Sequence, residues 1–431
     1  MGEYLSKLPD GTVKQRNPFG GTRVWTVSGR GNRPLAVVKK EPKPLQQGDR
    51  EHACVFCSGQ YLKTPPEKDR LIRSAEGWEY RQAVLPKDYY LPVAEFRRIP
   101  NLFEILSYDY WHLNYGYELS ADILERKRAY LDDPQGRNHV LYVVKNKLKA
   151  MGVDPDSKTQ AELLELSSAF FASGHDVIVP RRHYTDDAVD TAGLSFSGSL
   201  TPDEHEQFIR FTIDAARDLY ADNRYARYVA VFQNWLQPAG ASIEHLHKQL
   251  VAIDDWGGRQ SASIKKLRKN PNVFNEDGTN YASMKNLFIA ENDYALAFAG
   301  FGHRYPTIEI YSKSEASFPW EHEAQEVRAM SDLIHAMHAA TGVEIPTNEE
   351  WHYRPIDFNL PMPWRVMLKW RISTLAGFEG DTKIYLNTID PWTLRDRVVP
   401  RLYELRDSGA IAPIRIATEC AAKPNSLRYR W

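Results

Sequence analysis

The sequence predicts an α+β fold built from two related halves. The order strand, amphipathic helix, strand occurs at 176–235 and again at 293–374, without a strict sequence repeat. Between the two occurrences lies a polar segment of the kind that is typical of a linker. We therefore expect an N-terminal half at 1–260, a linker at 261–284 and a C-terminal half at 285–431.

In the N-terminal half, the first 50 residues are rich in Gly, Pro, Lys and Arg around one short strand, "TRVWTVSG". This pattern predicts a hairpin or an extended arm. A strand follows at 176–180, then a helix at 201–223, which a Thr201–Glu204 capping box and Pro202 begin, then a strand at 227–235. The stretch of about 105–165 fits neither half and carries two helical patterns, so we interpret it as an insertion.

The C-terminal half repeats this order. Strand patterns at 293–301 and 306–314 precede an amphipathic helix at 322–342, which Gly342 closes, and a further strand at 363–374.

Composition limits the classes of function. The 431 residues are 42% hydrophobic, enough for a sizeable core, and the formal charge is only -1. No global field therefore attracts nucleic acid or an anionic membrane, and any anion site is local. The sequence has no apolar run of about 18 residues, and its first residues lack a secretory pattern. We expect a cytoplasmic protein that binds neither nucleic acid nor membranes.

The chain has three cysteines, and two of them, Cys54 and Cys57, stand in "CVFC". An odd, low count does not suggest a disulfide framework. Two thiolates at this spacing can bind one metal from a tight turn, and tetrahedral zinc then needs two further ligands. The alternatives are a redox pair and two buried apolar cysteines. The Pro-rich sequence that follows weakens the redox interpretation, because such pairs usually precede a helix.

A second motif, "GASIEHLHKQLVAI", places His245, His247 and Gln249 at every second position. A strand would align all three on one face. An imidazole can be a metal ligand, a general base or a nucleophile, and an amide can hold a phosphoryl oxygen. The alternative is a pair of structural histidines. Arg30 and Arg33 stand in a Gly-containing loop that can bind phosphate, although a solvated loop with two arginines is also ordinary.

Several motifs together resemble the galactose-1-phosphate uridylyltransferase family of the histidine-triad superfamily. The matching segments follow in the family's order: "RNPFGGTRVWTVSGR", "CVFCSG", "IPNLFEIL", "HDVIVPRRHYTDDA" and "VFQNWLQPAGASIEHLHKQLVA". The resemblance implies two histidine-triad-like halves, each an antiparallel sheet flanked by helices. It also implies a zinc enzyme that moves a nucleoside monophosphate between sugar-1-phosphate groups, with a nucleotide sugar and a sugar phosphate as substrates.

The resemblance assigns roles residue by residue. His247 matches the nucleophile that becomes a nucleotidyl-histidine, and Gln249 matches the residue that holds the phosphoryl oxygens. The positions that match zinc ligands are Cys54, Cys57, His183 and His245. The positions that match phosphate or nucleotide contacts are Arg30, Arg33, Asn101, Asn234 and Ser242. Family members are often homodimers, which implies a homodimer here.

The chain also departs from the family. Leu102 follows Asn101 where the family has Asp, which removes one polar nucleotide contact and puts uridine specificity in doubt. Many members bind a second metal with a Glu and three His, but here His352 is joined by Met367 and Lys369. A protonated lysine is a poor ligand, so we predict no second metal. Lys369 can bind an anionic substrate or be an ordinary surface charge, and we favour the surface charge.

Three functions are consistent with these residues. The first is the nucleotidyltransferase described above. The second is a phosphorylase that acts on a nucleotide sugar or a dinucleoside polyphosphate, because inorganic phosphate can be the acceptor in the same chemistry. The third is a non-catalytic nucleotide-binding protein, which the altered C-terminal half suggests.

Overall fold

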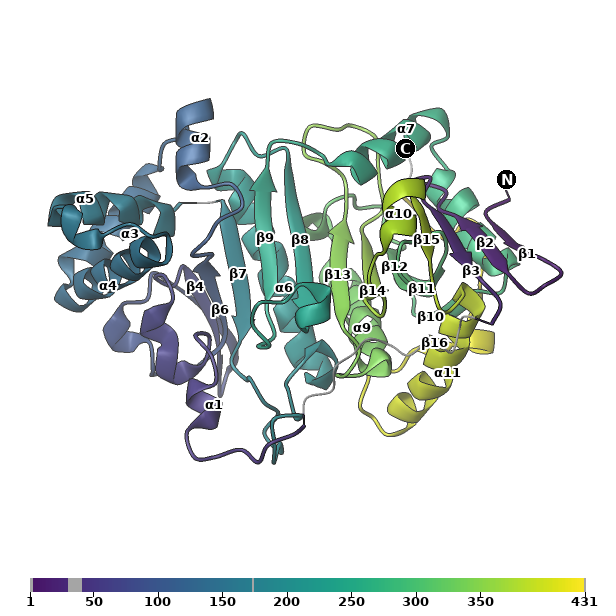
Figure 1. Cartoon of the computed structure of the whole chain (residues 1–431), viewed down its shortest axis with the longest axis horizontal. Helices are drawn as coiled ribbons and strands as arrows, with labels where there is room; N and C mark the ends of the chain where they lie inside the picture. The colour runs from purple at the N-terminus through teal and green to yellow at the C-terminus, as the bar shows by residue number, and fades with distance from the viewer. Residues whose placement is uncertain (1–2, 30–40, 173, 430–431) are drawn as a thin grey trace.

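The computed structural model describes residues 3–29, 41–172 and 174–429, and it confirms the predicted α+β class. Figure 1 shows strands from both halves of the chain side by side across the middle of the molecule. Within the described residues these strands form one twelve-stranded sheet, in which every pair of neighbours is antiparallel. In spatial order the strands are β16 (Arg415–Ile416), β10 (Phe288–Glu291), β11 (Ala295–Gly300), β12 (Thr307–Ser312), β14 (Arg365–Trp370), β13 (Thr347–His352), β8 (Tyr228–Trp235), β9 (Lys248–Ile253), β7 (His175–Pro180), β6 (Ala94–Pro100), β4 (Asp69–Ser74) and β5 (Gly77–Gln82).

The two long helices cover one face of this sheet, and shorter helices lie at its ends and over the second half. The α-helices are α1 (Asp49–His52), α2 (Tyr108–Tyr115), α3 (Ala121–Asp132), α4 (Pro134–Ala150), α5 (Gln160–Glu165), α6 (Pro202–Asp222), α7 (Gly258–Lys269), α8 (Tyr281–Met284), α9 (Ala324–Thr341), α10 (Gly377–Thr382) and α11 (Pro391–Asp407). The helix α6 packs on β7, β8 and β9, the helix α9 packs on β11, β12 and β14, and the two helices contact each other. The sequence predicts both helices, and the Thr201–Glu204 capping box is present at the start of α6.

The two halves have the same strand order about their junction. From the junction outward the first half runs β8, β9, β7, β6, and the second runs β13, β14, β12, β11. In each half the long helix, α6 or α9, connects the third of these strands to the first. The strand β14, which carries Met367 and Lys369, thus has the position in its half that β9 has in the other.

The junction is a continuous ladder. The strands β13 and β8 pair over four residues, from Thr347 opposite Trp235 to Glu350 opposite Phe232. On the face that α6 covers, the ammonium of Lys248 in β9 reaches across β8 and lies 2.6 Å from a carboxylate oxygen of Glu349 in β13. Both side chains are fully buried. The halves therefore share one sheet and one core.

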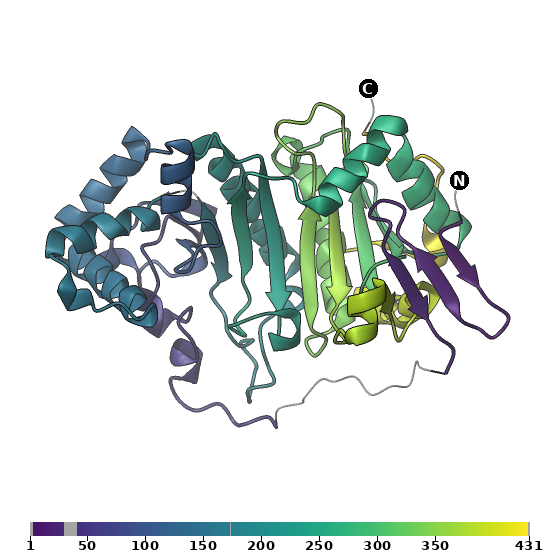
Figure 2. The same ribbon diagram turned by 45° about the horizontal axis from the view of Figure 1, so that its top comes forward.

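The N-terminal segment packs on the second half. The strands β1 (Leu5–Lys7), β2 (Val13–Arg16) and β3 (Arg23–Thr26) form an antiparallel meander, and β15 (Ile384–Leu386) adds to β3 in parallel. Figure 2 shows this meander beside the green and yellow elements of the second half. The predicted hairpin or arm is thus an ordered sheet. It packs on the second half, although its residues belong to the segment 1–260 that we expect to form the first half.

The segment predicted as a linker, 261–284, is helical in the structure. It contains most of α7, a π-helix at Phe274–Asn280, and α8. Ile264, Leu267 and Phe274 are buried in the main core, because this segment covers apolar surface of the second half. The division of the chain into domains stays a prediction.

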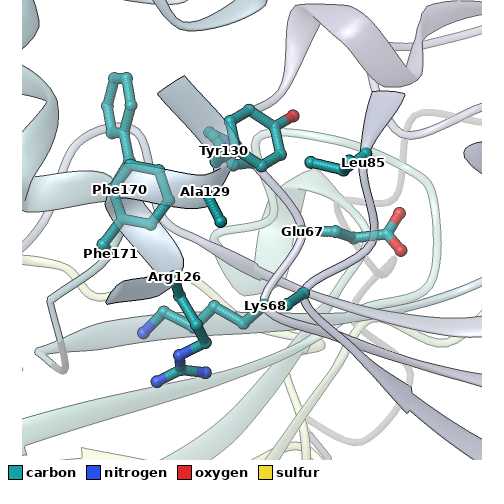
Figure 3. Close-up of a pocket in the computed structure, with 10 residues that line it drawn as sticks. Glu67, Lys68, Leu85, Arg126, Ala129, Tyr130, Phe170 and Phe171 are labelled. Carbon is teal, nitrogen blue, oxygen red and sulfur yellow. The ribbon is translucent and has the colours of Figure 1, made fainter. Parts of the chain in front are cut away.

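The insertion forms a helical layer with its own small core, at the left of Figure 1. Where it meets the first half, a cavity of about 40 Å³ has Tyr130, Phe170 and Phe171 on one side and Lys68 and Arg126 on the other (Figure 3). This volume suits a water molecule and is too small for a nucleotide. No helix in the described part of the chain is both long and apolar enough to cross a membrane.

Candidate active site

Two cysteines and two histidines from three distant segments meet at one point. The ligating atoms of Cys54, Cys57, His183 and His245 all lie within 4.8 Å of one another. The turn that holds the cysteines is tight, because the Cys57 N–H donates to the Cys54 carbonyl at 3.1 Å. His183 follows β7, and His245 precedes β9. Since β7 and β9 are neighbours in the sheet, the fold brings the two imidazoles together.

The spacing of these atoms fits tetrahedral zinc. Bonds of about 2.3 Å to sulfur and about 2.0–2.1 Å to nitrogen give S···S edges of about 3.8 Å and S···N edges of about 3.6 Å. The two Sγ atoms are 3.7 Å apart, and Nδ1 of His245 lies 3.5 Å from Sγ of Cys54 and 3.8 Å from Sγ of Cys57. Nδ1 of His183 lies 3.5 Å from Sγ of Cys57. The cluster is therefore able to hold a metal such as zinc.

The surroundings of the cluster favour bound metal. Nε2 of His245 lies 2.7 Å from the Pro180 carbonyl oxygen and donates to it, which leaves Nδ1 free to coordinate. A hydrogen bond from Cys54 lowers the pKa of the Cys57 thiol, and the same contact raises the pKa of Cys54. One proton is therefore shared by two sulfurs, and a cation would replace it.

His247 is held by the same segment. Its Nδ1 donates to the backbone carbonyl of His245 at 2.7 Å, so the unprotonated nitrogen is Nε2. Burial lowers the pKa of His247 to about 4, and only 5% of the residue is exposed. The ring of Phe56, from the turn between the cysteines, packs edge-on against it with centroids 5.4 Å apart. At neutral pH the ring is thus a neutral imidazole with one nitrogen lone pair available.

The predicted strand is shorter than expected at this motif. Only Gln249 lies in β9, whereas His245 and His247 precede it. The reason is Pro180 in the neighbouring strand: in the register of β7 and β9 it would face Leu246, and proline has no N–H for the ladder. The carbonyls of Pro180 and His245 instead accept hydrogen bonds from imidazoles.

Gln249 has a fixed amide orientation. Nδ1 of His175 accepts the Ile105 N–H at 3.3 Å, so Nε2 of His175 carries the proton and donates to Oε1 of Gln249 at 3.1 Å. Nδ2 of Asn101 lies 3.5 Å from the same oxygen and 3.1 Å from Nε2 of His175. Burial lowers the pKa of His175 to about 4, which keeps the ring neutral. Gln249 is half-buried as a residue, and its NH₂ group is thus left to donate to a ligand.

The remaining predicted contacts are placed as follows. Oδ1 of Asn234, in β8, accepts from Nδ2 of Asn348 at 2.7 Å. Ser242 is exposed in the connection between β8 and β9, and Arg30 and Arg33 lie outside the described residues. Leu102, which replaces the family's Asp, packs against the apolar cluster of the insertion. An apolar side chain suits this contact.

Lys369 is not a surface charge, and that prediction is wrong. Its side chain is 13% exposed and contacts the carboxylate of Glu350, which also lies 3.5 Å from Nε2 of His352. The register of β13 and β14 puts Lys369 opposite Asn348, on the sheet face away from α9, together with Glu350. A half-buried ion pair therefore lies at positions for which the family resemblance implies ligands of a second metal.

Comparisons with known proteins agree with this arrangement. The profile of one protein family, described as "Domain of unknown function (DUF4921)", matches residues 8–429. A galactose-1-phosphate uridylyltransferase of Thermotoga maritima is 24% identical over 214 residues, which cover 43% of this chain and 64% of that protein. An ADP-glucose phosphorylase of Arabidopsis thaliana is 28% identical over 177 residues, which cover 38% of this chain and 49% of that protein.

A solved structure shares the fold over nearly its whole length. It is an ADP-glucose phosphorylase from Arabidopsis thaliana with bound ADP-glucose, with a TM-score of 0.57 and 17% sequence identity. The match covers 91% of this chain and 98% of that structure.

Proposed function

The chain belongs to the DUF4921 family, and we propose that it is a nucleotidyltransferase that works through a nucleotidyl-histidine on His247. The substrates would be a nucleotide sugar and a sugar phosphate. The observation that carries the proposal is the pairing of a neutral His247, with Nδ1–H held by a carbonyl, and a Gln249 amide turned outward by His175. Both named relatives are enzymes of nucleotide sugars or sugar phosphates, which supports the substrate class.

The proposed reaction has two displacements. Nε2 of His247 attacks the α-phosphorus, a P–N bond forms, and the P–O bond to the sugar phosphate breaks with its electron pair on the departing oxygen. A phosphate oxygen of the acceptor then attacks the same phosphorus and releases His247. In both steps the proton stays on Nδ1 and is donated to the His245 carbonyl, which stabilises the charged ring. The Gln249 NH₂ donates to the non-bridging oxygens, where negative charge is concentrated.

We propose that Cys54, Cys57, His183 and His245 bind one zinc ion. Its role would be to fix the backbone of His245, whose carbonyl orients His247. We also propose that no second metal binds, because the ammonium of Lys369 already neutralises Glu350. A homodimer and a cytoplasmic location remain proposals from the family resemblance and the sequence.

The test is covalent labelling. The chain is incubated with UDP-glucose or ADP-glucose labelled in the α-phosphate, and acid-labile label on the protein is measured. We expect label on the unaltered chain, none on His247→Gly or His247→Ala, and unchanged label on the control His112→Gln, an exposed histidine of α2. Retained label on the His247 variants would exclude this nucleophile. Absence of label with every nucleotide sugar would favour mere binding.

A phosphorylase is the second candidate, and the match to an ADP-glucose phosphorylase favours it. Release of the label separates the two activities. Chase by glucose 1-phosphate or galactose 1-phosphate indicates a transferase, whereas chase by inorganic phosphate alone indicates a phosphorylase.

A further inference from the structure

A large cavity opens on the face of the sheet away from α6 and α9. It has a volume of about 570 Å³ and lies over the junction of β8 and β13, beneath the start of α7. Its wall includes Phe232 and Asn234 from β8, Glu350 from β13, and Trp256 from the segment before α7. The metal cluster contributes no residue to this wall, so the cavity is distinct from that site.

The cavity is lined by basic groups. Arg259 and Arg371 belong to its wall, and Lys369 stands behind Glu350. Nη1 of Arg259 is 3.7 Å from Glu350, and Nη2 lies 2.7 Å from Nδ1 of His303, whose Nε2 faces Glu309. Arg371 has no carboxylate within ion-pair distance among the described residues, and its buried Nε has no hydrogen-bond partner there. Its Nη1 is bound to Asn348 and its Cζ lies 4.6 Å from the centre of the Tyr305 ring, so Nη2 is the group left to bind an anion.

The titratable and charged groups that face Lys369 are Glu350 from β13, Arg259 from α7, Arg371 beyond β14, and His303 between β11 and β12. Burial lowers the pKa of Lys369 to about 8. The two arginines also lower it, while the attraction of Glu350 raises it. A further negative group is therefore electrostatically favourable here.

The start of α7 adds backbone donors. The helix begins after Gly257, which has a φ of 74° and no capping side chain. A Cβ placed on Gly257 or Gly258 would meet nothing within 4 Å, so the space above both glycines is open. The free N–H groups of a helix start and its partial positive charge attract anions. This helix start and Arg371 thus line the same cavity.

The cavity is connected to His247 by the register of the strands. Nη1 of Arg371 donates to Oδ1 of Asn348 at 2.7 Å, and Nδ2 of Asn348 donates to Oδ1 of Asn234 at 2.7 Å. Asn348 and Asn234 are cross-strand partners, and the paired part of β8 and β9 ends at Phe232 opposite Gln249; continued by two residues, this register would bring His247 beside Asn234. Continued in this way, the row would put two strand spacings, about 10 Å, between Asn348 and His247.

We propose that this cavity receives the sugar end of the substrate and selects a sugar phosphate with a second anionic group, either a carboxylate or another phosphate. The inference rests on the proposed function, because it takes His247 as the position of the reacting phosphorus. Arg259 and Arg371 would bind the second anion, while Phe232 and Trp256 would line the sugar. A neutral sugar would leave the guanidinium of Arg371 without a counter-charge.

The test compares ligands that differ only in that group. Calorimetry on the full chain measures the affinities of glucose 1-phosphate, glucuronic acid 1-phosphate and glucose 1,6-bisphosphate. We expect at least one of the doubly anionic sugars to bind at least about tenfold more tightly than glucose 1-phosphate. Preference for the uronic acid or for the bisphosphate identifies the source of the anion.

Variants locate the effect. Arg371→Gln and Arg259→Gln should each bring the affinity ratio close to one, whereas the control Arg217→Gln, an exposed arginine of α6, should leave it unchanged. Each ratio is measured on one preparation, so a partly unfolded variant still gives a valid value. Equal affinities for all three ligands, or a ratio that survives in Arg371→Gln, would overturn the inference.

The two proposals can fail separately. If nucleotide label forms on His247 but the affinity ratio is one, only the cavity assignment is wrong. If no label forms but the ratio holds and persists in His247→Gly, only the nucleotidyl transfer is wrong.

Discussion

Replacing His175 by Phe tests whether this buried histidine acts through Gln249. Phenylalanine keeps a ring of similar size in β7 but removes the Nε2–H that donates to Oε1 of Gln249 at 3.1 Å. The Gln249 oxygen then retains only the longer contact with Asn101, at 3.5 Å. Its amide is free to turn and present oxygen instead of NH₂ to the phosphate.

The expected loss of labelling rate follows from the hydrogen bond that is removed. A hydrogen bond between neutral groups contributes about 0.5–1.5 kcal/mol, which corresponds to about a 2- to 13-fold slower labelling step. Gln249→Leu removes the donor itself, for which a loss of about 100- to 1,000-fold is expected. The double variant should be no slower than Gln249→Leu alone, since His175 has no other route to the phosphate.

The assay is the single-turnover rate of nucleotide labelling of His247, with the thermal midpoint of each variant as a check on folding. Multiplicative losses in the double variant would refute the reasoning, because they would show that His175 affects the reaction independently of Gln249. A lower thermal midpoint with an unchanged labelling rate would mean that His175 is only structural.

Three further predictions concern the metal, the core and the charge of the cavity. We expect about one zinc ion per chain in the unaltered protein by elemental analysis. Cys57→Ser should lose this zinc and should have a lower thermal midpoint, and full zinc content in the variant would contradict the assigned ligands. Lys248→Met should lower the free energy of unfolding by about 3 kcal/mol in urea titrations, because it removes the ammonium that neutralises the buried Glu349 carboxylate, which keeps its contacts with His338 and Trp351. Combining it with Glu349→Leu should recover part of the loss. The preference for doubly anionic sugars should weaken between pH 7 and pH 9, because Lys369, with its pKa lowered to about 8, loses its proton in that range; a flat profile, or one unchanged in Lys369→Arg, would contradict this.

Local patterns in the sequence predict the fold class and the main elements well. Helix α6 begins where its capping box predicts, and helix α9 ends at Gly342, because these signals depend on near neighbours in the chain. The continuous sheet is harder to predict from the sequence, since the pairing of β8 with β13 joins residues more than 100 positions apart. The sequence pattern does not predict the helices at 261–284, because the apolar residues of this segment are sparse among polar ones.

The candidate site also has some residues that the sequence predicts and others whose role depends on the three-dimensional structure. The spacing of Cys54 and Cys57 indicates a metal turn without any structure, whereas His183, a single imidazole in a loop, is suggested only by the family resemblance. His175 lies in the quoted "HDVIVP" segment, yet its role depends on its contact with Gln249 across two strands. The environment of Lys369 likewise depends on the register of β13 and β14, which the sequence does not give.

The ladder between β8 and β13 has a consequence for how the molecule can work. Opening the two halves like a hinge would break the backbone pairing, separate Asn348 from Asn234 and pull Lys248 away from Glu349. Such a motion therefore cannot change the distance between His247, the proposed nucleophile, and the arginines of the cavity. If one molecule binds at both places as proposed, it has to match a length that the sheet holds constant.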